Sequence, residues 1–166
     1  AAVGLPGETP NQCQTHLFLT RAQDFPADPA LQAEMFGAAS LIVQCADDNE
    51  MRQVIEHLEG QLTATLQLDD ADLDSARALL PVLERKAGRL LVNGWPTGVE
   101  VSDAMVHGGP FPATSDPRTT SVGTAAIQRF LRPVCYQDFP DALLPAALQQ
   151  GNPLQLRRLL DGQREA

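Results

Sequence analysis

Basic residues, cysteines, aromatic residues and long apolar runs are all scarce in this sequence. The 166 residues include 12 lysines and arginines against 21 aspartates and glutamates, a formal net charge of −9. Binding nucleic acid through its phosphates requires a basic face, so we expect no nucleic-acid partner. No apolar run approaches the roughly 18 residues that a membrane-spanning helix requires, so we expect no membrane partner.

The three cysteines, Cys13, Cys45 and Cys135, are odd in number and far apart. This spacing indicates free thiols in a reducing compartment and no disulfide framework, so we expect a cytoplasmic protein. The neighbouring Cys13 and His16 lack a third group that could complete a nucleophilic triad. The histidines and cysteines also lack the spacing of a zinc site, so we expect no metal ligand.

Phosphate-binding glycine motifs and a recognisable chain start are absent as well. No G-x-G-x-x-G follows an expected strand, and there is no P-loop. The opening stretch, A-A-V-G-L-P-G-E-T-P, has no initiator methionine and no signal-peptide pattern. We therefore expect that the chain is part of a longer one.

What is present is a clear β-α-β-α-β pattern in the centre of the chain. Residues 40–46, 62–68 and 89–93 read as strands. Apolar residues at helical spacing predict a helix in each interval, and Pro81 should kink or divide the second. This order with short links predicts right-handed crossovers and a parallel sheet.

On the N-terminal side, residues 15–20 read as a strand. Asp28 suits a helix N-cap and Pro29 the first helical position, which predicts a short helix that ends at Gly37.

The C-terminal half is less regular. Residues 94–120 form a loop rich in glycine and proline, and loops of this length are usually functional. We expect a helix over 119–129, an edge strand over 130–137 because it contains Pro133, and a further helix over 154–160.

Several polar residues are candidates for a ligand site. Parallel sheets bind ligands beyond the carboxyl ends of their strands, which nominates Asp47, Asp69 and Asn93. The two aspartates are more simply helix caps, whereas Asn93 opens the long loop and could contact a substrate. Glu34 and Phe36 leave two alternatives: an exposed charge beside a core aromatic, or a pair that touches a ligand.

Motifs along the chain resemble the aldehyde dehydrogenase superfamily. The stretch A-E-M-F-G-A-A-S-L-I-V is similar to the family's E-x-F-G-P segment, and G-R-L-L-V-N to its G-x-x-x-V-N element. H-G-G-P-F-P-A-T-S-D-P-R-T-T-S-V-G resembles the segment that leads to the C-terminal oligomerisation strand. The match keeps the family's order from residue 31 to residue 140, and its wording is closest to bacterial NADP-linked members that act on 2,5-dioxopentanoate (α-ketoglutaric semialdehyde).

The resemblance implies a fold and an assembly. The fold would be α/β, a three-layer αβα parallel open sheet with a C-terminal oligomerisation strand. Residues 1–118 would be the C-terminal part of the catalytic domain, residues 119–140 the helix and oligomerisation strand, and residues 141–166 a tail. The whole protein would be a homo-oligomer, a dimer or a tetramer.

The resemblance also implies a reaction, the oxidation of a small aldehyde to a carboxylate with NADP or NAD through a cysteine thiolate. Glu34 matches the glutamate that binds the nicotinamide ribose, and Phe36 the phenylalanine that packs beside the nicotinamide. Both roles suit the side chains, because a carboxylate accepts O–H donors and an aromatic face restrains a ring.

Two departures from the family pattern limit this interpretation. Ala38 stands where the family has proline. In this family the nucleophilic cysteine and the general-base glutamate lie far upstream of the E-x-F-G segment, so this chain would hold no catalytic residue and would need the remaining N-terminal part. The alternative is a stand-alone α/β module that binds a ligand or a protein without catalysis.

Overall fold

The computed structural model describes residues 1–164. It is a mixed α/β structure with small parallel sheets. Residues 1–130 form one compact unit and the residues after 130 form a second, and the two are described separately. The boundaries predicted after residues 118 and 140 remain predictions. Within the described residues, no helix combines the length and apolar character that crossing a membrane requires.

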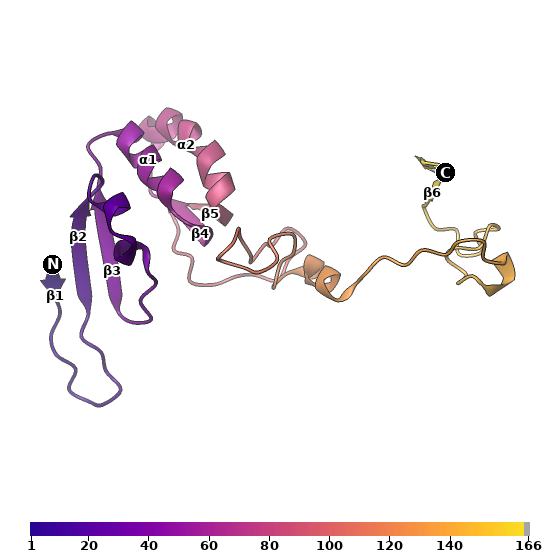
Figure 1. Cartoon of the computed structure of the whole chain (residues 1–166), viewed down its shortest axis with the longest axis horizontal. Helices are drawn as coiled ribbons and strands as arrows, with labels where there is room; N and C mark the ends of the chain where they lie inside the picture. Colours follow the sequence, from indigo (N-terminus) through magenta and orange to yellow (C-terminus); the bar gives the residue numbers. More distant parts are fainter. Residues whose placement is uncertain (165–166) are drawn as a thin grey trace. The chain divides into compact units, whose positions relative to one another are not determined.

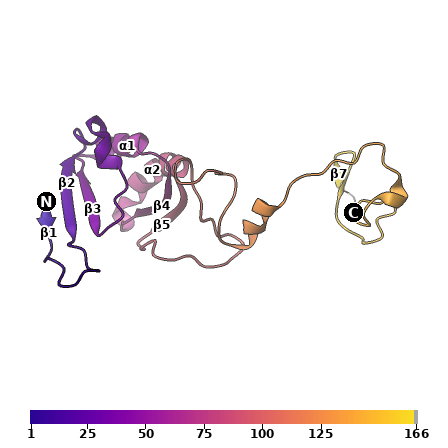
Figure 2. The same cartoon turned by 60° about the horizontal axis from the view of Figure 1, so that its bottom comes forward.

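The first unit begins with a three-stranded sheet. Strands β2 (His16–Arg21) and β3 (Ala39–Gln44) pair in parallel, and the short β1 (Ala2–Val3) pairs antiparallel with the other edge of β2 (Figure 2). Both strands predicted for this part of the chain are confirmed, within one or two residues at each end.

The segment between β2 and β3 is less helical than predicted. It contains only two short 3-10 helices, η1 (Phe25–Ala27) and η2 (Pro29–Gln32). Asp28 caps η2 as expected, because its carboxylate accepts a hydrogen bond from the Ala30 amide at 3.0 Å. The predicted helix up to Gly37 is therefore wrong in length, since this segment packs few apolar side chains that could stabilise a longer helix.

Helix α1 (Asp48–His57) covers one face of this sheet. The Asp47 carboxylate caps it by accepting from the Glu50 amide at 2.8 Å, as the sequence predicted. Val54 of α1, Ala22 and Phe25 form a buried core cluster beneath the helix. The Asp47 cap therefore fixes where α1 begins, and the apolar face with Val54 packs the helix against the core cluster.

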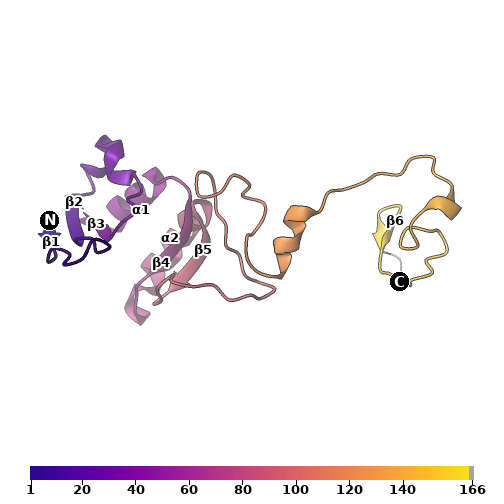
Figure 3. The ribbon, with the colours of Figure 1, turned by 90° about the horizontal axis from the view of Figure 1, so that it is seen from below.

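The second sheet lies after α1. Strands β4 (Gln61–Leu66) and β5 (Ala87–Val92) pair in parallel, and η3 (Asp70–Asp72) and α2 (Leu73–Lys86) connect them (Figure 3). Pro81 lies inside α2 but does not divide it. Helices α1 and α2 lie side by side (Figure 1). Three apolar side chains of α2, Leu79, Val82 and Leu83, are buried.

The predicted continuous sheet is not seen in the described part of the chain. β3 pairs only with β2, and β4 only with β5, so the three central strands fall into two separate sheets. Strands belong to one sheet only when hydrogen bonds join each strand to the next. No strand of the first sheet pairs with a strand of the second among the described residues. The single three-layer sheet therefore remains a prediction.

Much apolar surface is uncovered. Leu17, Leu19 and Ile42, on the face of the first sheet opposite α1, are 41%, 61% and 47% exposed. Surfaces of this kind are normally covered by more protein.

Glycines allow the long loop to lie against the second sheet. A Cβ atom at Gly60 would approach the Pro110 carbonyl oxygen closer than 3.0 Å, and one at Gly88 would approach the Gly108 carbonyl oxygen equally closely. A Cβ at Gly109 would likewise overlap the Gln61 carbonyl oxygen. The stretch around residue 109 is therefore packed backbone to backbone on the first residues of β4 and β5.

The end of the first unit and the start of the second differ from the sequence prediction. Helix η4 (Thr124–Phe130) is a 3-10 helix that occupies the second half of the helix predicted over 119–129. Residues 131–137 form no strand among the described residues. A strand needs a paired neighbour, so the oligomerisation strand predicted over 130–137 is not confirmed and remains a prediction.

The second unit ends in a hairpin where a helix was predicted. Helix η5 (Asp141–Leu143) is followed later by the paired strands β6 (Leu159–Leu160) and β7 (Gln163–Arg164). The two residues between the strands, Asp161 and Gly162, have φ values of 52° and 79°. An Asp-Gly pair with positive φ forms a tight hairpin turn, so the helix predicted over 154–160 is wrong.

The close backbone approach leads to a first prediction. Gly88→Ala should lower the free energy of unfolding by about 1–3 kcal/mol, because the new methyl group would displace the backbone of the loop. Gly98→Ala is the matched control, since nothing lies within 4 Å of a Cβ at that position. Urea unfolding followed by circular dichroism measures both; equal stability of the two variants would contradict the packing described here.

Candidate functional site

The stretch E-M-F-G lies between two pockets of the first unit. Glu34 lines one pocket and Gly37 lines the other. Phe36 is 96% exposed, so it belongs to no core in this structure. One alternative from the sequence was that Phe36 is a core residue beside an exposed Glu34. That alternative is wrong for Phe36, because its side chain is exposed.

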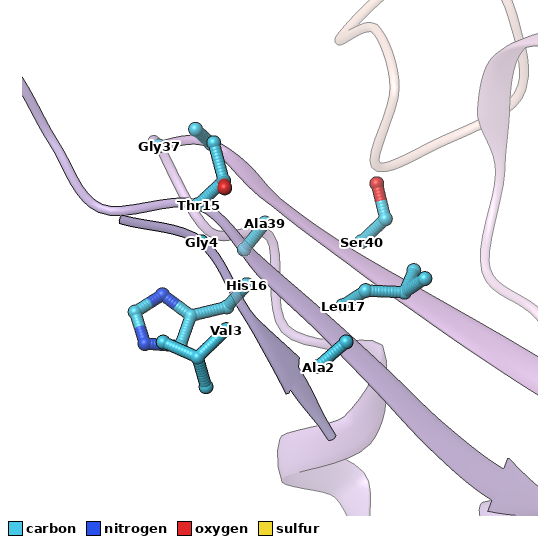
Figure 4. A pocket seen from close by; sticks show the side chains of 10 residues that line it. Ala2, Val3, Gly4, Thr15, His16, Leu17, Gly37, Ala39 and Ser40 are labelled. Atoms are coloured by element: carbon cyan, nitrogen blue, oxygen red, sulfur yellow. The ribbon is translucent and has the colours of Figure 1, made fainter. Parts of the chain in front are cut away.

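The pocket at Gly37 has a volume of about 650 Å³ and opens at the starts of β2 and β3 (Figure 4). Small residues such as Gly4 and Ala39 line most of it. The ring of His16 is held at the backbone, because its Nδ1 lies 3.1 Å from the Gln14 carbonyl oxygen. With so few side-chain polar groups, this pocket offers little that could orient a ligand.

The pocket at Glu34, called the Glu34 pocket below, has a volume of about 630 Å³. Three segments that are far apart in the sequence build it: the residues before β3, the start of β4, and the long loop. Its polar lining consists of Gln32, Glu34, Glu59, Gln61, Thr63 and His107. Its concave shape and clustered polar groups make it the stronger candidate for a binding site.

His107 is held in the wall of this pocket by its backbone. Its amide donates to the Thr120 hydroxyl at 2.8 Å, and its carbonyl oxygen accepts from the Ser121 amide at 3.0 Å and from the Ser121 hydroxyl at 2.9 Å. Thr120 is the one polar side chain in the buried set of described residues, and its hydroxyl also donates to the Val122 carbonyl at 2.7 Å. The loop is therefore an ordered part of the site.

The lining of the Glu34 pocket can accept hydrogen bonds from hydroxyl groups of a ligand. The Glu34 carboxylate can accept two O–H donors. Gln32 Oε1 and His107 Nδ1 are buried without a hydrogen-bond partner in residues 1–164, which leaves two further polar atoms for a ligand. Phe36 does not line this pocket.

Asn93 has a structural role at the end of β5. Its side chain accepts from the Leu68 amide at 2.8 Å and donates to the Leu68 carbonyl at 2.8 Å, and its φ is 52°. Both amide groups are thereby engaged in tying the ends of β4 and β5 together. A contact between Asn93 and a substrate remains a prediction.

The other nominated aspartate is a cap. The Asp69 carboxylate accepts from the Ala71 amide at 2.8 Å, and the Asp72 carboxylate accepts from the Asp69 amide at 3.0 Å. This capping box, together with Asp47 at α1, confirms the interpretation of both aspartates as caps.

The surroundings of the cysteines do not activate a thiol as a nucleophile in this structure. Burial raises the pKa of the Cys45 thiol, and the carboxylates of Glu50 and Asp47 raise it further. A cysteine nucleophile needs a lowered pKa. Cys13 and Cys135 are exposed, and no cluster of three or more histidine, cysteine or acidic side chains that could hold a metal ion occurs within residues 1–164.

Comparison with known proteins shows that this chain is similar to dehydrogenases. It is 65% identical over 162 residues to alpha-ketoglutaric semialdehyde dehydrogenase 2 of Azospirillum brasilense. It is 54% identical over 162 residues to alpha-ketoglutaric semialdehyde dehydrogenase of Acinetobacter baylyi. These matches cover 98% and 97% of this chain but only 31% of the length of each relative. No family model matches the chain.

These similarities confirm the resemblance to aldehyde dehydrogenases that the motifs indicated. The roles assigned to Glu34 and Phe36 remain predictions. The structure brings Glu34 together with Gln32 and His107, and sequence reasoning missed both of these residues. The H-G-G-P-F-P wording of the loop was the one signal that could have pointed to His107, whereas nothing local distinguishes Gln32.

The thiol environments lead to a second prediction. Near pH 7, Cys45 should react with iodoacetamide about 10-fold or more slowly than Cys13 and Cys135, because burial and a raised pKa both reduce its thiolate. The gap should narrow as the pH rises towards the pKa of Cys45. Mass spectrometry of labelled peptides measures each rate, and rapid labelling of Cys45 at pH 7 would contradict this environment.

Proposed function

We propose that this chain is the C-terminal part of an NAD(P)-dependent aldehyde dehydrogenase whose substrate is 2,5-dioxopentanoate. The observation that carries the proposal is 65% identity, over 98% of this chain, to a relative named as an alpha-ketoglutaric semialdehyde dehydrogenase. Since the chain spans 31% of that relative's length, the activity belongs to a longer protein of which this chain supplies one part.

In this proposal the chain supplies part of the cofactor site. The Glu34 carboxylate accepts hydrogen bonds from the nicotinamide ribose, and the exposed ring of Phe36 packs beside the nicotinamide. A nicotinamide nucleotide held there, NADP or NAD, would supply the hydride acceptor for the oxidation of the aldehyde. The nucleophilic cysteine and the general base come from the remaining N-terminal part, so no residue of this chain acts as a catalytic nucleophile.

The uncovered surfaces support a larger whole. We propose that the remaining part covers the exposed face of the β2–β3 sheet and completes a three-layer open sheet, because apolar side chains such as Leu19 need a partner layer there. Residues 130–137 would pair as an edge strand with a neighbouring subunit in a homo-oligomer, a dimer or a tetramer. The full-length enzyme would act in the cytoplasm.

A third prediction follows for the isolated chain. Purified residues 1–166 should produce no NAD(P)H from 2,5-dioxopentanoate, because the thiolate and the general base are on the other part. Co-expression with the remaining part should restore activity if the exposed apolar faces are interfaces. Absorbance at 340 nm measures both, and steady turnover by the chain alone would favour a stand-alone protein and overturn the proposal.

The fourth prediction concerns Glu34. In the full-length enzyme, Glu34→Gln should raise the Kd of the nicotinamide nucleotide by about 10-fold, because an amide replaces a charged acceptor of two hydrogen bonds. Glu84→Gln is the matched control, since Glu84 is exposed on α2 and outside the pocket. Fluorescence titration with the reduced nucleotide measures the Kd; equal values for the two variants would remove Glu34 from the site.

A further inference from the structure

We propose that Gln32 and His107 are positioning residues for the diol of the nicotinamide ribose, in the same pocket as Glu34. The proposal rests on the proposed function and deepens it, because it assigns the second wall of that site to the long loop. It concerns residues of this chain that neither the motifs nor the names of the relatives single out.

Gln32 and His107 line the same pocket only in the folded chain, because they are far apart in the sequence. Gln32 ends η2, two residues before Glu34, whereas His107 lies in the loop that follows β5. Both line the Glu34 pocket together with Gln61 at the start of β4. The backbone contacts at Gly109 fix the distance between the loop and β4, so the pocket has a built shape.

Each residue has a polar atom that is buried without a partner. Gln32 Oε1 and His107 Nδ1 have almost no contact with solvent and no hydrogen-bond partner in the described part of the chain. Such atoms are uncommon in native proteins, since they have lost water without gaining a hydrogen bond. Two such atoms belong to residues that line one pocket. A small rotation of either side chain would let its polar atom form a hydrogen bond with a ligand in the pocket.

The support of His107 argues for a specific role. The His107 amide donates to the Thr120 hydroxyl, and the His107 carbonyl accepts from the amide and the hydroxyl of Ser121. These hydrogen bonds fix the part of the backbone from which the His107 ring projects into the pocket wall. A pre-organised polar group of this kind binds a ligand at low conformational cost.

The charge of the pocket selects the ligand group. The described residues that line it include the carboxylates of Glu34 and Glu59 but no lysine or arginine. A phosphate or the carboxylate of an oxo acid would be repelled, whereas neutral hydroxyl groups can donate to carboxylate and amide oxygens. The ribose diol matches this lining, and a hydroxylated aldehyde is the other source of the same chemistry.

The test compares variants of the full-length enzyme. His107→Phe keeps a ring but removes Nδ1, and Gln32→Leu removes Oε1 at similar volume. Both should raise the Kd of the reduced nucleotide about 3- to 10-fold, measured by fluorescence without aldehyde. Gln53→Leu, at an exposed position of α1 outside the pocket, should change it less than about 2-fold.

A conservative pair separates hydrogen bonding from packing. His107→Asn keeps a polar atom near the place of Nδ1 and should retain most of the affinity, whereas His107→Gln moves the polar group farther out and should not. This pair also decides the question if His107→Phe proves insoluble. Equal Kd values for the Asn and Gln variants would overturn the assignment of Nδ1.

The remaining outcomes distinguish this inference from the proposed function. If Glu34→Gln weakens nucleotide binding while the variants at Gln32 and His107 do not, the inference is wrong and the cofactor site at Glu34 stands. If no variant, including Glu34→Gln, affects nucleotide binding, the proposed cofactor site fails. A raised KM for the aldehyde with an unchanged nucleotide Kd would assign the pocket to a hydroxylated substrate and overturn the ribose assignment.

Discussion

The backbone contact between the long loop and the starts of β4 and β5 is the constraint on which the candidate site depends. It exists because Gly60, Gly88 and Gly109 have no Cβ atom, so carbonyl groups can lie where side chains would otherwise stand. The contact places His107 in the wall of the Glu34 pocket. The Thr120 hydroxyl accepts from the His107 amide and donates to the Val122 carbonyl, and these hydrogen bonds hold the later part of the same loop.

The pocket and the surface of the chain together indicate half of a binding site within a larger protein. Phe36 is almost fully exposed, and the apolar face of the first sheet has no covering layer. The lining of the Glu34 pocket includes carboxylate and amide oxygens that can accept hydrogen bonds but no lysine or arginine, which suits a neutral, hydroxyl-bearing group. In the proposed function, this chain would orient the nucleotide and the remaining part would supply the nucleophile.

Most of the local structure could be predicted from the sequence, and the errors have local causes. The caps at Asp47 and Asp69 were predicted correctly, because a capping carboxylate acts on amides only two or three residues away. The helix over 154–160 was wrong because the Asp-Gly turn at Asp161 outweighs a short run of leucines. Pro81 did not divide α2, since packing of the apolar face of the helix maintains it.

The sequence by itself determined the order of the main strands and helices between residues 15 and 93, the helix caps, the resemblance to aldehyde dehydrogenases and the nomination of Glu34. These depend on spacing and on interactions within a few residues. Only the tertiary structure decided that β3 pairs with β2 and not with β4, and that His107 shares a pocket with Gln32. The two residues lie 75 positions apart (107 − 32), and they share the pocket because the backbone packs closely at Gly109, a long-range contact that spacing along the chain does not predict.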